Sequence, residues 1–379
     1  MKTSRDILFF ADGGSQHSEK WISAQRENGD NCYWISLHSS ACPLPDVKYY
    51  EFSKGPMILR FLKAILFGRA LLKKRQIDMC HGHYIGVYGL AAWFIPRPLV
   101  LTAWGTDVLI SSKNALKRAL IRLVIRKAKI ITYDGGHVEL KLYDLGATKK
   151  QLRFVNFGVD CEYFNEHDLP ALPEYFASVG RSELSQQLSE FLVGSEFVVL
   201  SNRNLERVYG IDTLIKAWQR VCKKDGMSKL VIAGDGPLRD DLEELVKQLG
   251  LANSILFIGK YDKEELLHIL NAVDAYVSPS KSDAGLATSV AEAMACCVPV
   301  IVSDFGENGK WVIPSKTGIL FSVGNHKDLS NKIVELKNNL EDSNIMGRAG
   351  RQIMLKNNDY RSEMAKYFLL LDDFFAAYN

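Results

Sequence analysis

The chain has 379 residues, too many for one ordinary hydrophobic core, so we expect two domains. Its composition, 47% hydrophobic and 24% charged, is that of a soluble globular protein. No apolar run approaches the roughly 20 residues that a membrane span needs, and the first apolar run, Ile7–Phe10, is too short for a secretory signal.

The formal net charge is only +3, but the charges are unevenly distributed. Residues 1–160 hold 24 Lys and Arg against 13 Asp and Glu, whereas the remainder holds 23 against 31. This asymmetry predicts that the first half faces an anionic partner. The seven cysteines show no CxxC spacing, which argues against a zinc site or a disulfide framework and favours a reducing cytoplasm.

Short apolar strands alternate with amphipathic helices along the chain, which predicts the α/β class with parallel sheets and helical crossovers. We expect eleven strands: Ile7–Phe10, Cys32–Ser36, Met79–His81, Leu99–Thr102, Ile130–Thr132, Arg153–Val155, Phe197–Ser201, Lys229–Ala233, Ile255–Ile258, Ala275–Val277 and Val300–Val302. The stretch Asp168–Gln187 has no strand pattern and contains two prolines, so we expect a linker there. A final helix, Arg361–Ala376, repeats apolar residues at helical spacing and is expected to pack across both domains.

Two segments of the first half, residues 54–75 and 113–129, are strongly basic. The later one groups four basic residues on one helical stripe and four apolar residues elsewhere: Arg118, Arg122, Arg126 and Lys129, against Leu116, Leu120, Leu123 and Val124. Like charges four residues apart repel, so an uncompensated stripe indicates an anionic partner. One interpretation is a solvated face above a core stripe, and the other is a surface that docks on anionic lipid headgroups. Nucleic acid is not expected, because aromatic residues are not interleaved for base stacking.

Three segments of the second half follow strands and indicate chemistry. The first, Ser201–Asp212, contains Arg203 and Arg207, and arginine can bind phosphate oxygens in a bidentate manner. Loops beyond the carboxyl ends of strands are where open α/β sheets bind ligands. The alternative is that both arginines are surface residues beside a turn.

The second segment runs from the strand Lys229–Ala233 through Gly234-Asp235-Gly236-Pro237 into a helix. Such a tight turn lets a ligand approach the backbone, although the glycines could serve the turn alone. The segment lacks the GxGxxG spacing of a dinucleotide fold.

The third segment begins at Val277-Ser278-Pro279-Ser280 and enters a helix near Thr288. Free backbone N–H groups at Thr288 and Ser289, together with the helix dipole, suit a diphosphate. Glu292, about one turn in, can accept hydrogen bonds from a ribose diol, or is an ordinary first-turn glutamate favoured by the dipole.

In their order and spacing, these segments resemble the retaining glycosyltransferases of family 4, the group 1 glycosyltransferases, which adopt the GT-B fold. The resemblance rests on Ala233–Pro237, the Pro279-Ser280 pair, Glu292–Ala295 and Asn156–Asp160, and it covers nearly the whole chain. It implies two Rossmann-like domains facing across a cleft. These would be residues 1–168 with a returning helix at 358–379, and residues 188–357.

The resemblance also assigns donor-binding roles. Arg203 matches the family's diphosphate-binding arginine, and Gly234 lies in the matching turn. Tyr209 stands where the family has a lysine, so Arg207 is the candidate for the missing cation. Tyr261 lies in the segment that usually reads the nucleotide base.

Glu292 matches the second glutamate of the family's E-x7-E signature, which holds the ribose. The first glutamate is replaced by Ala284, and Asp283 is the candidate substitute that would contact donor-sugar hydroxyls.

In the first domain, Asp12–Ser15 looks like the family's flexible glycine loop, which implies that Gly14 lies near the phosphates. Trp104 occupies the position of the family's histidine beside the donor sugar. His83 and Asp107 remain as candidate catalytic groups near the same face. The alternatives are a satisfied strand-end histidine and a helix N-cap, respectively.

Retaining transfer in this family is pictured as front-side displacement, in which the leaving diphosphate takes the acceptor's proton. That mechanism needs stabilisation of phosphate charge more than a protein base. Because Arg203 and helix N–H groups would supply it and no DxD motif is present, we expect no cofactor and no required metal.

The expected partners are a UDP-, GDP- or ADP-sugar and a glycan or glycolipid acceptor, with peripheral contact at the cytoplasmic face of an anionic membrane. Two rivals stay open: a nucleotide-sugar epimerase or phosphorylase of the same fold, and an inactive glycan-binding homologue.

Overall fold

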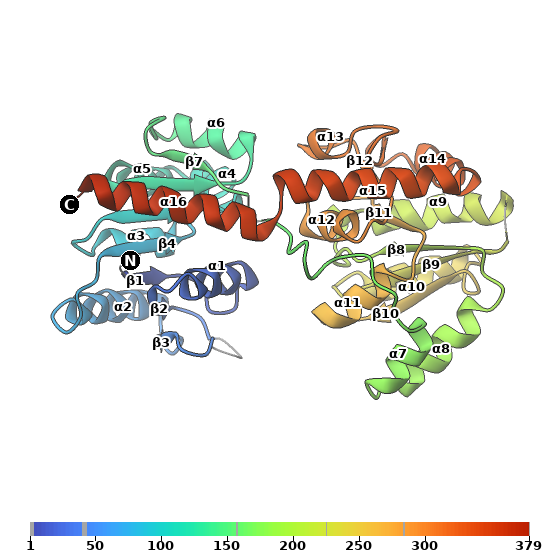
Figure 1. The fold of residues 1–379 in the computed structure, drawn as a ribbon, viewed down its shortest axis with the longest axis horizontal. Helices are drawn as coiled ribbons and strands as arrows, with labels where there is room; N and C mark the ends of the chain where they lie inside the picture. The colour runs from blue at the N-terminus through green and yellow to red at the C-terminus, as the bar shows by residue number, and fades with distance from the viewer. Residues whose placement is uncertain (1–3, 40–43, 157, 225, 283–284, 379) are drawn as a thin grey trace. The chain divides into compact units, whose positions relative to one another are not determined.

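The computed structural model describes residues 4–378 apart from 40–43, 157, 225 and 283–284. The chain folds into two compact units (Figure 1). Unit 1 comprises Met1–Phe157 and Glu363–Asn379, and unit 2 comprises Gly158–Ser362. The first unit therefore ends earlier in the chain than residue 168.

The sheet of unit 1 has seven parallel strands among the described residues, in the order β3-β2-β1-β4-β5-β6-β7. They are β1 (Asp6–Phe10), β2 (Asn31–Ser36), β3 (Lys48–Glu51), β4 (Met79–His83), β5 (Leu99–Thr102), β6 (Ile130–Tyr133) and β7 (Leu152–Phe154). The helices are α1 (Gln16–Glu27), α2 (Met57–Leu71), α3 (Val87–Trp93), α4 (Thr106–Leu109), α5 (Ala115–Lys127) and α6 (Gly136–Asp144), with a 3-10 turn η1 (Ser111–Lys113).

The sheet of unit 2 has six parallel strands in the described part, in the order β10-β9-β8-β11-β12-β13. They are β8 (Phe197–Ser201), β9 (Ser228–Ala233), β10 (Ile255–Gly259), β11 (Ala275–Ser278), β12 (Val300–Ser303) and β13 (Ile319–Phe321). The helices are α7 (Leu172–Ser178), α8 (Ser182–Leu192), α9 (Ile211–Lys224), α10 (Arg239–Gln248), α11 (Lys263–Leu270), α12 (Thr288–Ala295), α13 (Asn308–Trp311), α14 (His326–Asn338) and α15 (Leu340–Asn357), with a 3-10 turn η2 (Arg207–Tyr209).

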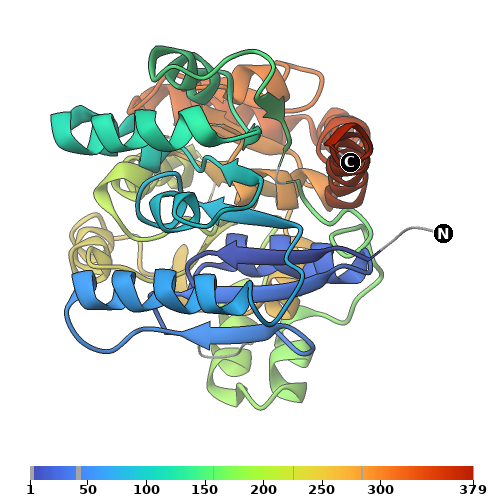
Figure 2. The same cartoon turned by 90° about the vertical axis from the view of Figure 1, so that its left-hand side faces the viewer.

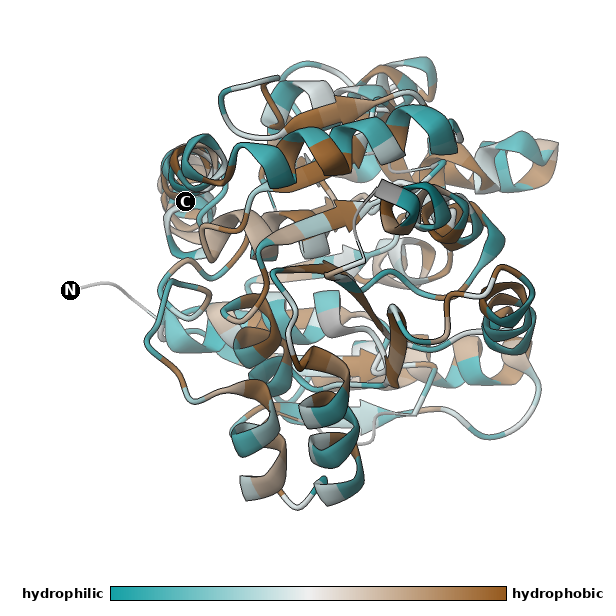
Figure 3. Ribbon diagram, turned by 90° about the vertical axis from the view of Figure 1, so that its right-hand side faces the viewer, coloured by the Kyte–Doolittle hydropathy of each residue, from teal (hydrophilic) through white to brown (hydrophobic). Residues whose placement is uncertain are grey.

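Strands of unit 2 are buried on both faces. Along β8, Phe197 and Val199 join one core cluster while Val198 and Leu200 join another, because successive side chains point to opposite faces. Helices cover both faces of such a sheet, so its strands read as nearly continuous apolar runs. Figure 3 shows these strands mainly in the hydrophobic colour.

All eleven predicted strands are confirmed within a residue or two at their ends. The sequence missed β3 and β13, each of which lies at one edge of its sheet. The stretch expected as a linker instead contains α7 and the start of α8 and belongs to unit 2. Pro173 is compatible with α7 because it occupies the helix's first turn, where no backbone N–H is needed.

The final helix, α16 (Tyr360–Tyr378), starts in unit 2 and packs within unit 1 from Glu363 onward. Tyr367 is fully buried, with its ring centroid 5.0 Å from that of Trp21 in an edge-on contact. The buried Arg5 binds Asp372 of this helix and Asp30 at 2.9 Å each. These contacts make α16 an integral part of unit 1.

Candidate functional site

The strand order of unit 2 places two of the predicted segments next to each other. The chain runs from β8 outward to β9 and β10, and then returns to the other side of β8 as β11. Ligands of open α/β sheets bind beyond the carboxyl ends of the strands where the order reverses in this way. The segments that follow β8 and β11 contain Arg203 and lead into α12, respectively.

Hydrogen bonds join these two segments through one hydroxyl. Nη1 of Arg203 donates to Oγ of Ser289 at 2.9 Å, and the Tyr276 hydroxyl donates to the same Oγ at 2.9 Å. The contact holds the guanidinium beside the first turn of α12, where the helix dipole favours an anion. The sequence did not predict this role of Tyr276, because a tyrosine within an apolar strand is expected to be part of the hydrophobic core.

Tyr209, at the position of the family's lysine, packs against Arg203. The guanidinium carbon lies 4.5 Å from the centroid of the Tyr209 ring, which is a cation–π geometry. Tyr209 therefore orients the arginine and does not supply a second charge. Arg207 belongs to the same turn and is exposed.

A second cation near this loop, Lys281, was missed in the sequence. Its backbone N–H donates to the carbonyl oxygen of Val208 at 2.8 Å, and its Nζ lies 3.3 Å from Oδ1 of Asp212. Gly210 permits the close approach: its φ is +67°, and a Cβ there would lie 2.3 Å from the carbonyl oxygen of Pro279. The position of Lys281 in the loop between β11 and α12, next to the predicted anion site, could have indicated it as a candidate cation.

Tyr261 and Glu292 share the electrostatic surroundings of Arg203. The Tyr261 hydroxyl donates to the carbonyl oxygen of Asn202 at 3.3 Å. Burial raises the pKa of Tyr261 to about 12, the Glu292 carboxylate adds to the rise, and Arg203 opposes it. Residues predicted from three different segments thus lie close enough to influence one another's charge.

The glycine turn after β9 supports the Arg203 loop through backbone packing. Gly234 has a φ of +112°, donates its N–H to the carbonyl oxygen of Gly259 at 2.7 Å, and leaves only 3.4 Å between a Cβ and the carbonyl oxygen of Arg203. A Cβ on Gly236 would lie 2.6 Å from the carbonyl oxygen of Leu205. Both glycines are therefore required where the two loops meet.

The beginning of α12 is suited to an anion. Its N-cap residue is Ala287, whose side chain cannot accept a hydrogen bond from the first-turn N–H groups, and Thr288 is exposed. Those N–H groups can therefore serve a ligand. Asp283 and Ala284 lie outside the described residues.

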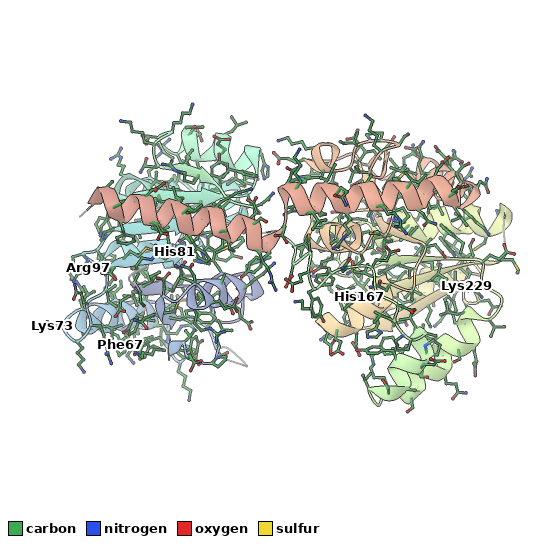
Figure 4. The ribbon with its side chains drawn as sticks, in the orientation of Figure 1. Phe67, Lys73, His81, Arg97, His167 and Lys229 are labelled. Atoms are coloured by element: carbon green, nitrogen blue, oxygen red, sulfur yellow. The ribbon has the colours of Figure 1, made fainter. Side chains whose placement is uncertain are left out.

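In unit 1, His83 lies inside a cluster of rings. It is completely buried, 5.6 Å from Trp21 and 5.9 Å from Trp104 between ring centroids. Burial lowers the pKa of His83 to about 3, and neither ring nitrogen has a hydrogen-bond partner among the described residues. His81, which Figure 4 labels within the strands of this unit, does have one: its Nε2 lies 2.8 Å from the Thr102 hydroxyl.

Asp107 is also buried, and backbone groups use its carboxylate. Oδ2 accepts the N–H of Ile85 at 2.8 Å, and Oδ1 accepts those of Trp104 and Val108 at 3.1 Å. Burial raises the pKa of Asp107 to about 6, against the effect of these hydrogen bonds. Asp107 is the second residue of α4, whose N-cap is Gly105, so it is not the predicted N-cap; its carboxylate instead ties the β4–α3 turn to the start of α4.

The glycine loop after β1 is tightly built. Gly14 is exposed and donates its N–H to Oδ1 of Asp12 at 2.9 Å. A Cβ on Gly13 would lie 2.3 Å from the Tyr49 hydroxyl. Behind this loop, His17 stacks on Trp104 with ring centroids 4.8 Å apart.

The structure corrects the expected packing of α5. Ile121, Val124 and Ile125 face the core, whereas Leu116, Leu120 and Leu123 are exposed. Of the basic stripe, Arg122, Arg126 and Lys129 are exposed and Arg118 is half-buried. In the described part of the chain, every helix is too short or too polar to span a bilayer.

Comparisons with known proteins agree with this geometry. Residues 185–353 match the model of the family described as glycosyl transferases group 1, and residues 6–134 match that described as glycosyl transferase 4-like. HepE from Anabaena, solved in complex with UDP, superposes with a TM-score of 0.79 at 17% identity, over 98% of this chain and 100% of that one. The fold is therefore GT-B, the fold of a class of glycosyltransferases.

Two curated relatives extend the comparison. The N-acetyl-alpha-D-glucosaminyl L-malate synthase of Bacillus anthracis is 24% identical over 77% of this chain and 73% of its own length. The alpha-monoglucosyldiacylglycerol synthase of Streptococcus pneumoniae is 25% identical over 77% of this chain and 65% of its own length. The chain belongs to the group 1 glycosyltransferases and is a glycosyltransferase enzyme.

Proposed function

We propose that the protein transfers a sugar from a nucleoside diphosphate sugar to a hydroxyl of a lipid-linked glycan or glycolipid, with retention of anomeric configuration. The observation that carries the donor assignment is the junction of Arg203, Ser289 and the first turn of α12 at the reversal point of the unit 2 sheet. A fixed guanidinium and the N–H groups of Thr288 and Ser289 at the start of α12 suit a diphosphate, and HepE, of the same fold, was solved with UDP.

The remaining donor contacts follow from the same junction. Glu292, one turn into α12, would accept hydrogen bonds from the ribose hydroxyls, and the segment at Tyr261 would meet the base. Lys281 and Arg207 are the cations available to a second phosphate oxygen. Between them we favour Lys281, because Asp212 and the backbone of the loop hold it in place.

The chemistry depends on the leaving group. As the bond from the anomeric carbon to the diphosphate breaks, negative charge grows on the phosphate oxygens. Arg203 and the α12 N–H groups would stabilise that charge without reorganising. The leaving phosphate oxygen would then accept the proton of the attacking hydroxyl, so the step needs neither a histidine base nor a metal.

The lipid-linked acceptor is supported by one relative's name, which identifies a synthase of a glucosylated diacylglycerol. The excess of basic residues in unit 1 agrees with an acceptor at an anionic surface. The six described cysteines are all free thiols, which suits the reducing cytoplasmic side of such a membrane.

A panel of UDP-, GDP- and ADP-sugars tests the proposal by thermal stabilisation, because a ligand that binds the folded state raises its apparent stability. We expect one nucleotide series to stabilise the protein, and Glu292→Ala to abolish that shift while the unliganded melting temperature stays unchanged. If no nucleotide shifts the wild type, the chain is a binding homologue without donor chemistry.

Incubation with the stabilising donor and no acceptor separates transfer from epimerisation. Only an epimerase would change the configuration of the donor's sugar under these conditions. With an acceptor, proton NMR of the product should show the donor's anomeric configuration, and an inverted product would contradict the front-side mechanism.

A further inference from the structure

One layer of unit 1 contains, besides α6, the three neighbouring helices α2, α3 and α5. Buried residues of α2, α3 and α5 all belong to the same core cluster, so these helices cover the same face of the sheet. Figure 2 shows them toward the viewer, with α3 between α2 and α5. The side chains on their inward sides pack in that core, and the side chains on their outward sides can contact a partner.

The outward sides are apolar to an unusual degree. The exposed large hydrophobic residues on this layer are Met57, Ile58, Leu59, Leu62 and Leu66 on α2, Val87 and Phe94 on α3, and Leu116, Leu120 and Leu123 on α5. We call this set the apolar face. Ile58, Leu66 and Leu116 are 73%, 66% and 71% exposed, which excludes a role in the core. Large contiguous patches of this kind mark interaction sites.

The apolar face continues from helix to helix. The Phe61 and Phe94 rings meet edge-on with centroids 6.4 Å apart, which joins α2 to the end of α3. Lys127 of α5 reaches the carbonyl oxygen of Ile95 at 2.7 Å and lies 5.6 Å from the centroid of Trp93, which joins α5 to the same end. Leu116, Leu120 and Leu123 follow one another at intervals of one helical turn along α5, on the same stripe as Lys127.

The charged side chains on α2, α3 and α5 themselves are all basic, although Asp144 of α6 lies near Arg118 and Arg122, and Glu51 of β3 lines a pocket with Arg60 and Lys63. Residues 54–129 contain 15 Lys and Arg and two acidic residues, Asp78 and Asp107. Both carboxylates are committed inside the unit: Asp78 accepts the backbone N–H of Asp6 at 2.8 Å, and Asp107 accepts those described above. The exposed charges are basic, among them Lys63, Arg69, Lys73, Arg122 and Arg126. Figure 4 shows Lys73 projecting away from the ribbon.

We propose that the apolar face and its basic rim dock on an anionic lipid bilayer, with the leucines inserted among the acyl chains and the cations at the headgroups. Leucine-rich helices with Lys and Arg on the flanks bind at the bilayer interface in this way. A second copy of the chain would bring two cationic rims together, and nucleic acid would find one exposed aromatic ring, Phe94, on the face. The inference rests on the lipid-linked acceptor and names the surface that brings the enzyme to it.

Co-sedimentation with vesicles tests the proposal. The probes are vesicles of neutral phosphatidylcholine alone, and of phosphatidylcholine with about a third phosphatidylglycerol. We expect the wild type to pellet with the anionic vesicles at moderate salt, and at least tenfold less with the neutral ones, because each basic residue near the surface contributes to binding.

Two variants separate insertion from charge. Leu62→Gln/Leu66→Gln/Leu120→Gln should reduce binding to anionic vesicles about tenfold or more, including at high salt, because inserted apolar area is lost. Lys63→Gln/Arg122→Gln/Arg126→Gln should reduce it by a similar factor at low salt and little at high salt, where charges are already screened.

The matched control uses exposed residues of the same unit outside the three helices. Leu140 is 72% exposed on α6, and Lys149 and Lys150 are exposed before β7. Leu140→Gln/Lys149→Gln/Lys150→Gln should bind vesicles like the wild type. Equal binding of the leucine variant and the wild type, or no preference for anionic vesicles, would overturn the proposal. The proposal would also be overturned if the wild type were a dimer and the leucine variant a monomer, since the apolar face would then bind a second copy of the chain.

Donor stabilisation and transfer to a water-soluble acceptor are measured on the same proteins. Vesicle binding without donor binding leaves the docking surface standing and removes the proposed function. Transfer without vesicle binding removes the docking surface alone.

Discussion

The two units are built alike, yet their outer helices differ in chemistry. In unit 2, exposed helical charges come in opposite pairs one turn apart, such as Lys216 with Asp212 at 3.2 Å and Arg239 with Glu243 at 2.8 Å. In unit 1, α2, α3 and α5 contain no acidic residue, so no such pair can form within them. Both sheets fold with helices on them, so the fold does not require the cationic, leucine-rich surface. The difference is what the proposed docking of unit 1 on a bilayer would require.

The largest effect should come from Arg203, the charge of unit 2 to which we assign the leaving diphosphate. Arg203→Met should lower kcat by about 100- to 1000-fold, as the loss of one preorganised donor to a developing anion does. Steady-state assays with a water-soluble acceptor measure this effect. Lys150→Met, which removes an exposed charge of unit 1, should leave kcat unchanged. A comparable loss in both variants would mean that net charge matters and not its position.

The next effect concerns backbone geometry at the unit 2 site. Gly210→Ala should cost about 3 kcal/mol or more, because a Cβ would overlap the Pro279 carbonyl oxygen in addition to the left-handed strain. Gly250 has nearly the same φ, +68°, but open space around it, so Gly250→Ala should cost only about 1 kcal/mol. Urea denaturation of both variants gives the two values. Equal costs would show that the loop gives way and that the contact is not a constraint.

A smaller effect distinguishes the interior of unit 1. Burial lowers the pKa of both His81 and His83 from 6.5, for His83 to about 3, so the folded state holds these rings neutral. Their contribution to stability is complete above pH 6.5 and is lost as the pH falls below it, by up to about 1.4 kcal/mol per pH unit for each ring.

Hydrogen exchange at pH 7.5 and pH 5.5 measures this loss in each unit. We expect protection in the core of unit 1 to fall at the lower pH, and His83→Leu to make the fall shallower. An identical pH dependence in His83→Leu would show that this ring takes up its proton as readily in the folded state as in the unfolded state.

The smallest effect tests the claim that the apolar face is not core. Leu66→Gln should change the free energy of unfolding by no more than about 0.5 kcal/mol, as exposed substitutions usually do. The neighbouring Ile65, 6% exposed, provides the contrast: Ile65→Ala should cost about 2 kcal/mol or more. Similar costs at both positions would mean that Leu66 is packed.

Buried strands could be predicted because both of their faces are covered, which makes their sequence continuously apolar. The edge strands β3 and β13 could not, since Lys-Tyr-Tyr-Glu carries charges and Ile-Leu-Phe is only three residues long. The helices α7 and α8 were hidden by Pro170 and Pro173, which the sequence alone does not distinguish from linker prolines.

The sequence predicted which segments form the candidate site, but not which side chains contact one another there. Arg203, Tyr261 and Ser289 each follow a strand, and the strand order then brings them together. The Ser289 hydroxyl between Arg203 and Tyr276 depends on the register of two strands, which no local pattern encodes. Similarly, α5 has apolar residues on two sides, and its sequence does not show which side packs on the sheet. The structure shows that the side with Ile121, Val124 and Ile125 is the buried one.

The contacts of α16 have a consequence for how the protein is synthesised. The rings of Trp21 and His81 and the guanidinium of Arg5 acquire Tyr367 and Asp372 as partners only after residues 363–379 have been made. Translation of unit 2 separates these residues from residues 1–157, a delay of roughly 10–40 s at typical rates. The nascent amino-terminal unit therefore waits on the ribosome with an incomplete core until α16 has been made.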